Sequence, residues 1–414
     1  MSDTGTQASR IRDESDASLR RVRAGIDKRA MLLLASGHLG TDFANGALPA
    51  LLPFLVDRFD LSYTLAATLM LASAVSSSVI QPVFGLWSDR RGALWLLPAG
   101  VAVAGIGIAL AADAPSYWLV LVLVVVSGVG VAAFHPEGSK FAAYASGVRR
   151  ASGMSAFSIG GNVGFALGPI LATPFVVAFG LRGGLLLALP GLAIAGALLA
   201  AAPFLRGFAP DPAERAQQAV GEDRRGALAL LLGVIAFRSL AWFGLVTFVP
   251  LWEVSLGHSK AHGNHLLSLM LLTGGLGTIV AGPAADRIGR RPVLLASLLA
   301  TGPLVLVFVV VGGIPGAIAL ALVGACVIGT FGVTMVMSQE YLPRHIGMAS
   351  GLSIGLSIGL GGVAAVALGA LADAVDLRAA LYVCAAAPVA ALALALALPS
   401  STAGRRLQVE PVVP

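Results

Sequence analysis

The sequence predicts an all-α integral membrane protein, with twelve transmembrane helices in two pseudo-symmetric six-helix bundles. Hydrophobic residues make up 57% of the chain and charged residues only 12%, whereas a soluble domain carries about 25% charged residues. Apolar runs as long as a bilayer-crossing helix, about 20 residues each, follow one another along the chain. A short charged stretch occurs twice, about half a chain apart, and this indicates a duplicated half.

The repeated stretch is GLWSDRRG at residues 85–92 and GPAADRIGRR at residues 282–291. A second repeat has almost the same spacing, because ASG at 151–153 recurs at 349–351. Both copies of the charged stretch lie between apolar runs, so each is predicted to be a turn at the membrane surface.

The candidate spans divide the chain into two halves of six. The N-terminal bundle is predicted over 30–205, with spans near 30–56, 63–87, 93–112, 116–142, 151–179 and 183–205. The C-terminal bundle is predicted over 226–400, with spans near 226–254, 264–285, 292–312, 316–338, 346–373 and 378–399. A polar linker at 206–225 joins the bundles, and 1–29 and 401–414 are tails. Residues 1–29 lack the apolar core of a signal peptide, so we expect the first span to be retained.

The basic residues predict the orientation. Nearly all of the 27 Lys and Arg residues fall in the tails, in the linker or in one set of loops. The opposite loops hold only Arg58, Arg182, Lys260 and Arg378, and Arg238 lies inside a span. Because cytoplasmic loops are enriched in Lys and Arg, both termini are expected in the cytoplasm of a bacterium, with the helices in its inner membrane. The net charge is +6. Because the basic residues lie in loops between apolar spans, we do not expect nucleic acid as a binding partner.

Two predicted spans carry glycines at helical spacing. Small residues every fourth position let helices approach closely in lipid, so we expect these stripes to pack helices together and to provide a seam along which two bundles can move. The members are Gly160, Gly164, Gly168 and the adjacent Pro169 in the fifth span, and Gly351, Gly355 and Gly359 in the eleventh.

The repeated charged stretch resembles the loop signature G-x-x-x-D-R-x-G-R-[RK] of the major facilitator superfamily. The second copy fits it throughout, whereas the first departs from it after Gly92. The QEYLPR run at 339–344 resembles the end of the tenth helix in that superfamily. The resemblance covers about 30–400 and implies a transporter in which the first, fourth, seventh and tenth helices line a central cavity.

A narrower resemblance is to the fosmidomycin-resistance family of exporters. It rests on HLGTD at 38–42, on FHPEGS at 134–139 and on GGNVG at 160–164. The fourth span lacks the arginine of many drug antiporters. The resemblance implies export of small molecules against a proton gradient and leaves the substrate open.

Polar residues within the spans are the candidates for transport chemistry, because an ionised group near the bilayer centre costs about 2.5–3.5 kcal/mol. His38, Asp42 and Asn45 share one face of the first span. We expect Asp42 to exchange protons, with His38 as a second candidate, and Asn45 and Asp42 to contact substrate. A fixed ion pair for Asp42, oriented by His38, is the alternative.

His135 and Glu137 in the fourth span are further proton-coupling candidates, because a buried carboxylate can take up a proton. The alternative for Glu137 is a surface pair near Lys140. Glu340, at the equivalent end of the tenth span, is expected to form a structural pair with Arg344.

Arg238 is the candidate for binding an anionic substrate group, since a guanidinium offers a planar set of donors. Pairing with Asp42 is the alternative. His258, His262 and His265 have metal-like spacing, but no acidic partner is evident, and we expect a solvated loop and no metal. The repeated stretches are expected to gate and latch the conformations through Gly85, Asp89, Arg90, Gly282, Asp286, Arg287 and Arg290.

The sequence therefore predicts a monomeric secondary active transporter that works by alternating access, without a cofactor. Proton-coupled efflux of a small drug-like molecule, with an anion among the candidates, is the first hypothesis. Proton-coupled import of a small organic anion by the same residues is the second. A membrane-embedded enzyme is the third and is disfavoured, because the sequence has no nucleotide-binding loop and no zinc-protease motif.

Overall fold

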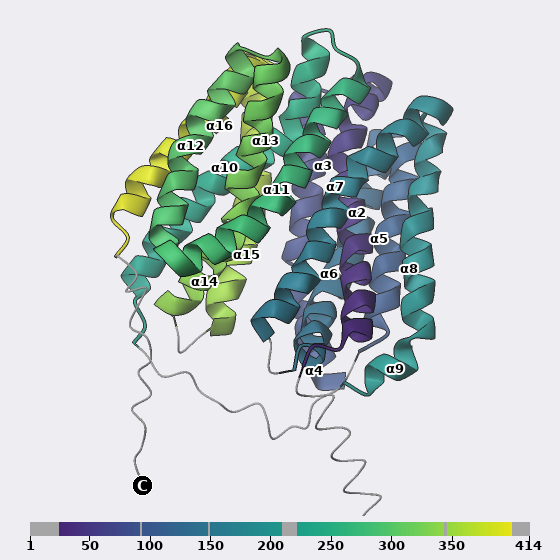
Figure 1. Cartoon of the computed structure of the whole chain (residues 1–414). Helices are drawn as coiled ribbons and strands as arrows, with labels where there is room; N and C mark the ends of the chain where they lie inside the picture. The colour runs from purple at the N-terminus through teal and green to yellow at the C-terminus, as the bar shows by residue number, and fades with distance from the viewer. Residues whose placement is uncertain (1–24, 92, 148–149, 209–221, 343–345, 400–414) are drawn as a thin grey trace, which may run out of the picture. The chain divides into compact units, whose positions relative to one another are not determined.

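A computed structural model of the chain describes residues 25–91, 93–147, 150–208, 222–342 and 346–399 (Figure 1). Within these ranges all regular structure is helical. The first helices are α2 (Lys28–Phe59), α3 (Tyr63–Ser78), α4 (Gln81–Arg91), α5 (Leu96–Asp113), α6 (Tyr117–Ala145), α7 (Arg150–Phe179), the 3-10 helix η1 (Leu181–Leu187), α8 (Ala188–Ala200) and α9 (Ala202–Arg206). The later ones are α10 (Arg225–Ser255), α11 (Lys260–Ile288), α12 (Arg290–Val310), α13 (Gly313–Gly329), α14 (Phe331–Tyr341), α15 (Ile346–Ala374) and α16 (Leu377–Leu396).

Twelve helical segments among the described residues are long and apolar enough to cross a membrane. Most are single helices, but three combine two consecutive segments: α3 with α4, η1 with α8, and α13 with α14. The predicted all-α membrane architecture with twelve spans is confirmed.

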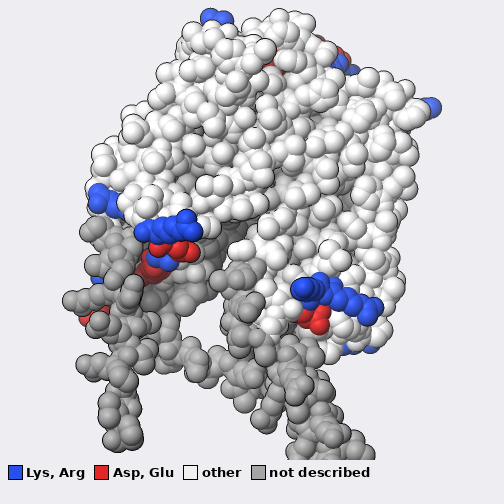
Figure 2. All heavy atoms as spheres, in the orientation of Figure 1, with Lys and Arg blue, Asp and Glu red and all other residues white. Residues whose placement is uncertain are grey.

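The outer surface fits a lipid environment. On the face drawn in Figure 2, Lys, Arg, Asp and Glu gather near the ends of the helices, and their flanks carry almost none. Large apolar side chains are exposed on several helices, among them Trp118, Val177, Val280 and Ile318. Exposed apolar surface of this extent marks a contact with a membrane or with another protein, and the twelve apolar segments favour the membrane.

The described residues form two compact units. Unit 1 contains the residues up to Leu48 and those from Val79 to residue 208, and unit 2 contains Pro49–Ser78 and the residues from 222 onward. The division falls inside α2 and between α3 and α4, so the second part of α2 and all of α3 belong with the later helices. The bundle boundaries expected from the sequence remain predictions.

Unit 1 is held together by a close approach of α7 to α2. Gly160, Gly164 and Gly168 face the α2 backbone, where an added Cβ would lie only 2.2, 2.2 and 2.3 Å from backbone atoms of Ala35, Leu39 and Gly46. Any side chain at these positions would push the two helices apart. The apolar core of unit 1 includes Leu34, Val101, Phe134 and Phe157 from α2, α5, α6 and α7.

Unit 2 packs α10 against α15 and α16, and α3 against α15. In α15 the close contacts differ from the predicted stripe. An added Cβ at Gly355 or Gly359 would meet nothing within 4 Å, whereas at Gly362 and Gly369 it would meet α3 at 3.0 and 2.8 Å. Gly362 and Gly369 follow Gly355 by seven and fourteen residues, which places them close to its face of the helix. The contact with α3 is therefore made further along α15 than the predicted stripe. The surroundings of Gly351 lie outside the described part of the structure.

Candidate functional site

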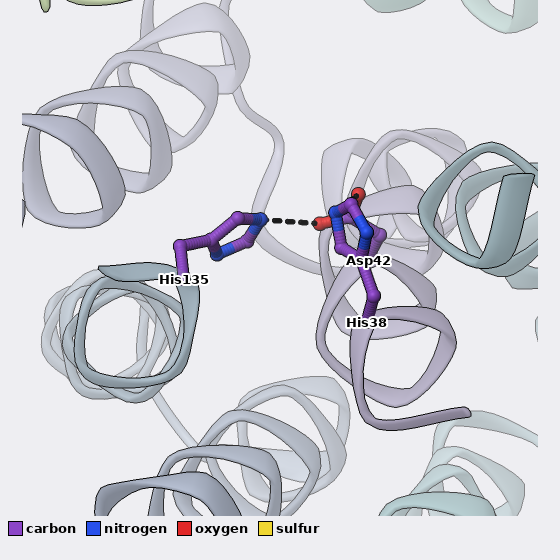
Figure 3. Close-up of side chains that lie close together, drawn as sticks. All are labelled: His38, Asp42 and His135. Atoms are coloured by element: carbon purple, nitrogen blue, oxygen red, sulfur yellow. Dashed lines mark ion pairs between the residues drawn. The ribbon is translucent and has the colours of Figure 1, made fainter. Parts of the chain in front are cut away.

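Three titratable side chains meet inside unit 1. His38 and Asp42 lie one turn apart on α2, and His135 reaches them from α6 (Figure 3). Asp42 Oδ2 is 3.2 Å from His38 Nε2, and Asp42 Oδ1 is 3.5 Å from His135 Nε2. Each carboxylate oxygen thus faces one imidazole. We call this group the His–Asp–His cluster.

The other ring nitrogen of each histidine is held by a backbone carbonyl. His38 Nδ1 lies 2.9 Å from the Phe157 carbonyl oxygen of α7, and His135 Nδ1 lies 2.9 Å from the Val131 carbonyl oxygen of α6. A carbonyl can only accept, so each Nδ1 donates its hydrogen. This fixes both rings with Nε2 toward Asp42.

The fixed rings determine what the cluster needs. A neutral imidazole with its hydrogen on Nδ1 presents only a lone pair at Nε2, and an ionised carboxylate also only accepts. A hydrogen bond between either ring and Asp42 therefore requires an added proton, on Nε2 or on the carboxyl group. When each of the two contacts with Asp42 holds one proton, both contacts are hydrogen bonds. When neither contact holds a proton, lone pairs of the rings face lone pairs of the carboxylate. The arrangement can bind and release protons.

Aromatic and glycine residues from α6 and α7 surround the cluster. The Phe157 ring stacks on His38 with centroids 4.3 Å apart, and His135 meets His38 edge-on at 5.0 Å. Gly161 lies behind them, where an added Cβ would be 2.5 Å from His38 Nε2 and 2.6 Å from Asp42 Oδ2. The roles of Phe157 and Gly161 are not predicted from the sequence, although the GG pair at 160–161 is a visible signal for a close contact.

The cluster is not sealed. The side chains of His38, Asp42 and His135 are 12%, 20% and 24% exposed. Asn45, three residues after Asp42 on the same helix, is half-buried. The cluster is therefore partly accessible from outside the packed helices.

Glu137 is separate from this cluster. Two residues after His135, it points to another side of α6. Its side chain is 1% exposed and one carboxylate oxygen lies 2.7 Å from Lys140 Nζ. The structure thus gives Glu137 the ion pair that was its alternative, in a buried rather than a surface position. Its proton-coupling role stays a prediction.

Arg238 is buried in unit 2, at 4% exposed. One guanidinium nitrogen donates to the Val327 carbonyl oxygen at 2.9 Å, and the group lies 5.6 Å from the centre of the Phe331 ring. Its Nε has no hydrogen-bond partner. Among the described residues of unit 2, no carboxylate forms an ion pair with Arg238. Burying an uncompensated charge is costly, so this group has capacity to hold an anion.

The second copy of the repeated stretch ends α11 and begins α12. Asp286 and Arg287 are exposed there, and Arg290 forms an ion pair with Glu340 at the end of α14. Arg290 reaches Glu340 because the α11–α12 turn lies against α14. The expected partner of Glu340, Arg344, lies outside the described residues, so that pair stays a prediction. In the first copy Gly85 belongs to α4, and the side chains of Asp89 and Arg90 are outside the described part. The gating role of these residues stays a prediction.

A second histidine cluster lies at the turn from α10 to α11. The Glu253 carboxylate contacts His258 Nδ1 at 2.6 Å and His262 Nε2 at 3.4 Å. The expectation that these histidines lack an acidic partner is therefore wrong. Glu253 precedes His258 by only five residues, but the turn that brings them together is not evident from spacing alone. This group and the His–Asp–His cluster are the two described sets of three side chains with metal-ligating atoms within 4.8 Å of one another.

Comparison with known proteins identifies relatives over most of the chain. The profile of the Major Facilitator Superfamily matches residues 34–263 and 231–412. The chain is 32% identical over 379 residues to the "Uncharacterized MFS-type transporter YfnC" of Bacillus subtilis, covering 89% of this chain and 92% of that protein. It is 30% identical over 367 residues to the "Fosmidomycin resistance protein" of Escherichia coli, covering 86% and 89%.

Solved structures share the fold at low sequence identity. A bacterial homologue of the human lysosomal transporter Spinster, in an inward-facing and occupied conformation, aligns with a TM-score of 0.71 at 16% identity, covering 89% of this chain and 96% of that one. A mutant of the nucleoside transporter NupG aligns with a TM-score of 0.69 at 13% identity, covering 89% and 99%. At these identities the likeness concerns the fold.

Proposed function

The chain belongs to the Major Facilitator Superfamily, and on that premise we propose that it exports a small molecule in exchange for protons. Family and fold make it a multi-pass membrane protein and a secondary transporter of a small molecule. Export is favoured by the fosmidomycin resistance of the Escherichia coli relative. Proton coupling rests on one observation, the carboxylate of Asp42 held between two imidazoles.

The His–Asp–His cluster supplies the coupling step in this proposal. When it holds a proton at each contact, both rings bond to Asp42, and α2 and α6 are tied together. When it loses them, the lone pairs of His38, Asp42 and His135 face one another and the tie weakens. Proton binding on one side of the membrane and release on the other thus favour different arrangements of these helices, as alternating access requires.

Arg238 is the proposed anion-binding group. Its guanidinium is positively charged and is held by a carbonyl and an aromatic ring rather than by a carboxylate of its own unit. Arginine matches the planar geometry of a carboxylate or phosphonate. We propose that Arg238 binds the substrate anion when Asp42 is protonated. Asn45, on the Asp42 face of α2, is a further candidate for substrate contact.

The proposed location is the bacterial inner membrane, with both termini in the cytoplasm and the protein active as a monomer. The orientation is supported by the enrichment of Lys and Arg in one set of loops. A proton-coupled importer of a small organic anion is the second candidate, because the same residues can work with opposite net flux. An enzyme is a weaker candidate than either, since the family consists of transporters.

Transport into everted membrane vesicles tests the proposal. With an acidified lumen, an antiporter accumulates fosmidomycin inside the vesicles and dissipates the pH gradient as it does so. An importer that moves substrate and protons together would instead expel a preloaded organic anion from the acid lumen. Drug-susceptibility profiles of a strain that lacks the gene identify further candidate substrates. If vesicles that contain folded protein accumulate none of the tested compounds, the export proposal is contradicted.

A further inference from the structure

We infer that Glu253, His258 and His262 form a binding site for a divalent transition metal of the Zn²⁺ class at the turn from α10 to α11. The site lies in unit 2 and shares no residue with the His–Asp–His cluster. Its three side chains are the ligand types that Zn²⁺ takes in proteins, two imidazoles and a carboxylate.

The turn brings the three ligands together by regular helix-end geometry. α10 ends at Ser255, and Gly257 follows with φ of 87°, a conformation that favours glycine. Backbone hydrogen bonds from Gly257 N to Val254 O and from His258 N to Glu253 O, at 2.9 and 3.0 Å, turn the chain back over the helix end. His258 is thereby placed above the Glu253 side chain.

The start of α11 supplies the third ligand. Ser259 caps this helix, and its side chain accepts from His262 N at 3.1 Å. His262 is on the first turn, and its Nε2 faces Glu253. Gly263 permits this close approach, because an added Cβ there would lie 2.9 Å from the Pro250 carbonyl oxygen and 3.2 Å from Glu253 Cβ.

The distances suit a metal with small changes. Zn²⁺ bonds of about 2.0–2.2 Å in a tetrahedron place neighbouring ligand atoms about 3.3 Å apart. The separation of His262 Nε2 from the Glu253 oxygen, 3.4 Å, already matches. The 2.6 Å hydrogen bond from His258 to Glu253 would open slightly as the ion replaces its proton. The ion would have three protein ligands and a fourth position for water.

Burial also favours the site. The Glu253 side chain is only 6% exposed, whereas His258 and His262 are about half exposed, so a buried carboxylate meets two accessible imidazoles. Two cations near this turn oppose a bound metal ion by their charge, but each already contacts another group. The Lys260 ammonium forms an ion pair with Asp57, and the Arg378 guanidinium lies over the Trp252 ring at 5.6 Å. The proposed ion would join the last turn of α10 to the first turn of α11.

Metal binding to the purified full-length protein, prepared without a histidine tag, tests the inference. Co²⁺ is the spectroscopic probe, because four-coordinate Co²⁺ absorbs strongly in the visible range, and Zn²⁺ is the competitor. We expect one Co²⁺ per chain at this site, displaced by Zn²⁺. Glu253→Gln and His262→Ala should each weaken binding by more than about tenfold, since even outer-shell changes cost about 10–100-fold.

Two control variants test whether the metal ion binds at this site. His265→Ala removes another exposed histidine of α11 and should leave the absorption unchanged. Asp42→Asn removes the carboxylate of the other cluster and should also leave it unchanged. The inference is overturned if Co²⁺ does not bind, if Asp42→Asn abolishes binding, or if His262→Ala binds as well as His265→Ala does. Thermal unfolding of each variant shows that the protein is folded.

Discussion

Gly161 leaves space for the His–Asp–His cluster because it has no side chain. An added Cβ at this position would lie within 2.6 Å of both His38 Nε2 and Asp42 Oδ2. Only a residue without a side chain lets α7 cover the cluster while both polar atoms keep their places. The packing of α7 against His38 thus depends on a residue that has no side chain.

Gly161→Ala is therefore expected to lower proton-driven transport by about tenfold or more, because displacements near 1 Å can cost about a hundredfold. Transport into vesicles under a fixed pH gradient measures the effect. Gly355→Ala is the matched control, since its Cβ would meet nothing within 4 Å. Equal activity of the two variants would show that the spacing around the cluster does not matter.

Arg238 allows a second prediction at this scale. If it binds the substrate anion, Arg238→Lys should weaken apparent affinity by about 10–100-fold, because hydrogen bonds to charged groups contribute about 1.5–3 kcal/mol. Protein abundance should stay near that of the unchanged protein. If Arg238 instead serves only to pair with Asp42, Arg238→Ala should misfold, and adding Asp42→Ala should restore both folding and transport. That rescue would refute the substrate role.

Contacts within one helix are predictable at the residue scale, and contacts between helices are much less so. The shared face of His38 and Asp42 follows from their spacing of four residues. The approach of His135 from α6 and the carbonyl of Phe157 from α7 depend on how the helices cross, which spacing does not encode. Glu253 was missed for a related reason, because a tight turn, rather than helical periodicity, brings it to His258.

At the scale of elements, α3 and α15 are linked through one carboxylate. Asp373, near the end of α15, accepts hydrogen bonds from the backbone of Tyr63 and Thr64 at 2.7 and 2.9 Å and from the Thr64 hydroxyl at 2.5 Å. These are the free donors of the α3 N-terminus, so Asp373 caps a helix that is distant in sequence. Contacts of this kind are candidates for a latch that forms and breaks during transport.

Asp373→Asn should loosen the contact between α3 and α15, since loss of a cap costs about 0.5–2 kcal/mol. The measurement is a cysteine cross-link between Leu71→Cys and Gly362→Cys, in a chain with Cys326 and Cys384 replaced. An added Cβ at Gly362 lies 3.3 Å from Leu71 Cα, so the two positions are adjacent. The reference is the same double-cysteine chain with Asp373 retained, because both chains carry the same crowding at position 362. The cross-linking yield should fall with Asp373→Asn.

Asp376→Asn is the control for this experiment. Asp376 also caps a helix, but it does so within its own segment, by accepting from Ala379 N at 2.7 Å. Its replacement should lower stability without changing the cross-linking yield. The latch interpretation fails if the two substitutions reduce the yield equally.

At the scale of the whole molecule, the sequence predicts the topology. The span count follows from the apolar runs, and the orientation follows from the basic residues. Reporter fusions after residues 60 and 215 should give opposite signals, periplasmic and cytoplasmic. Matching signals would contradict the predicted topology.

The fold was predictable at this scale because bilayer thickness and the repeated charged stretch constrain it strongly. The grouping of the helices is harder to predict, and in the structure α3 and the second part of α2 belong to the same compact unit as the later helices. Which helices cluster depends on side-chain packing between segments far apart in sequence. The apolar composition of a span does not specify which other spans it packs against.

The central claim is that Asp42 and its two histidines couple proton movement to transport, and Asp42→Asn in proteoliposomes tests it most directly. We expect this variant to lose accumulation driven by a pH gradient but to keep substrate counterflow, which needs no net proton movement. Glu137→Gln, measured in parallel, examines the other candidate carboxylate. If Asp42→Asn keeps full proton-driven transport, the central claim is wrong. If Glu137→Gln keeps it as well, neither carboxylate couples protons to transport.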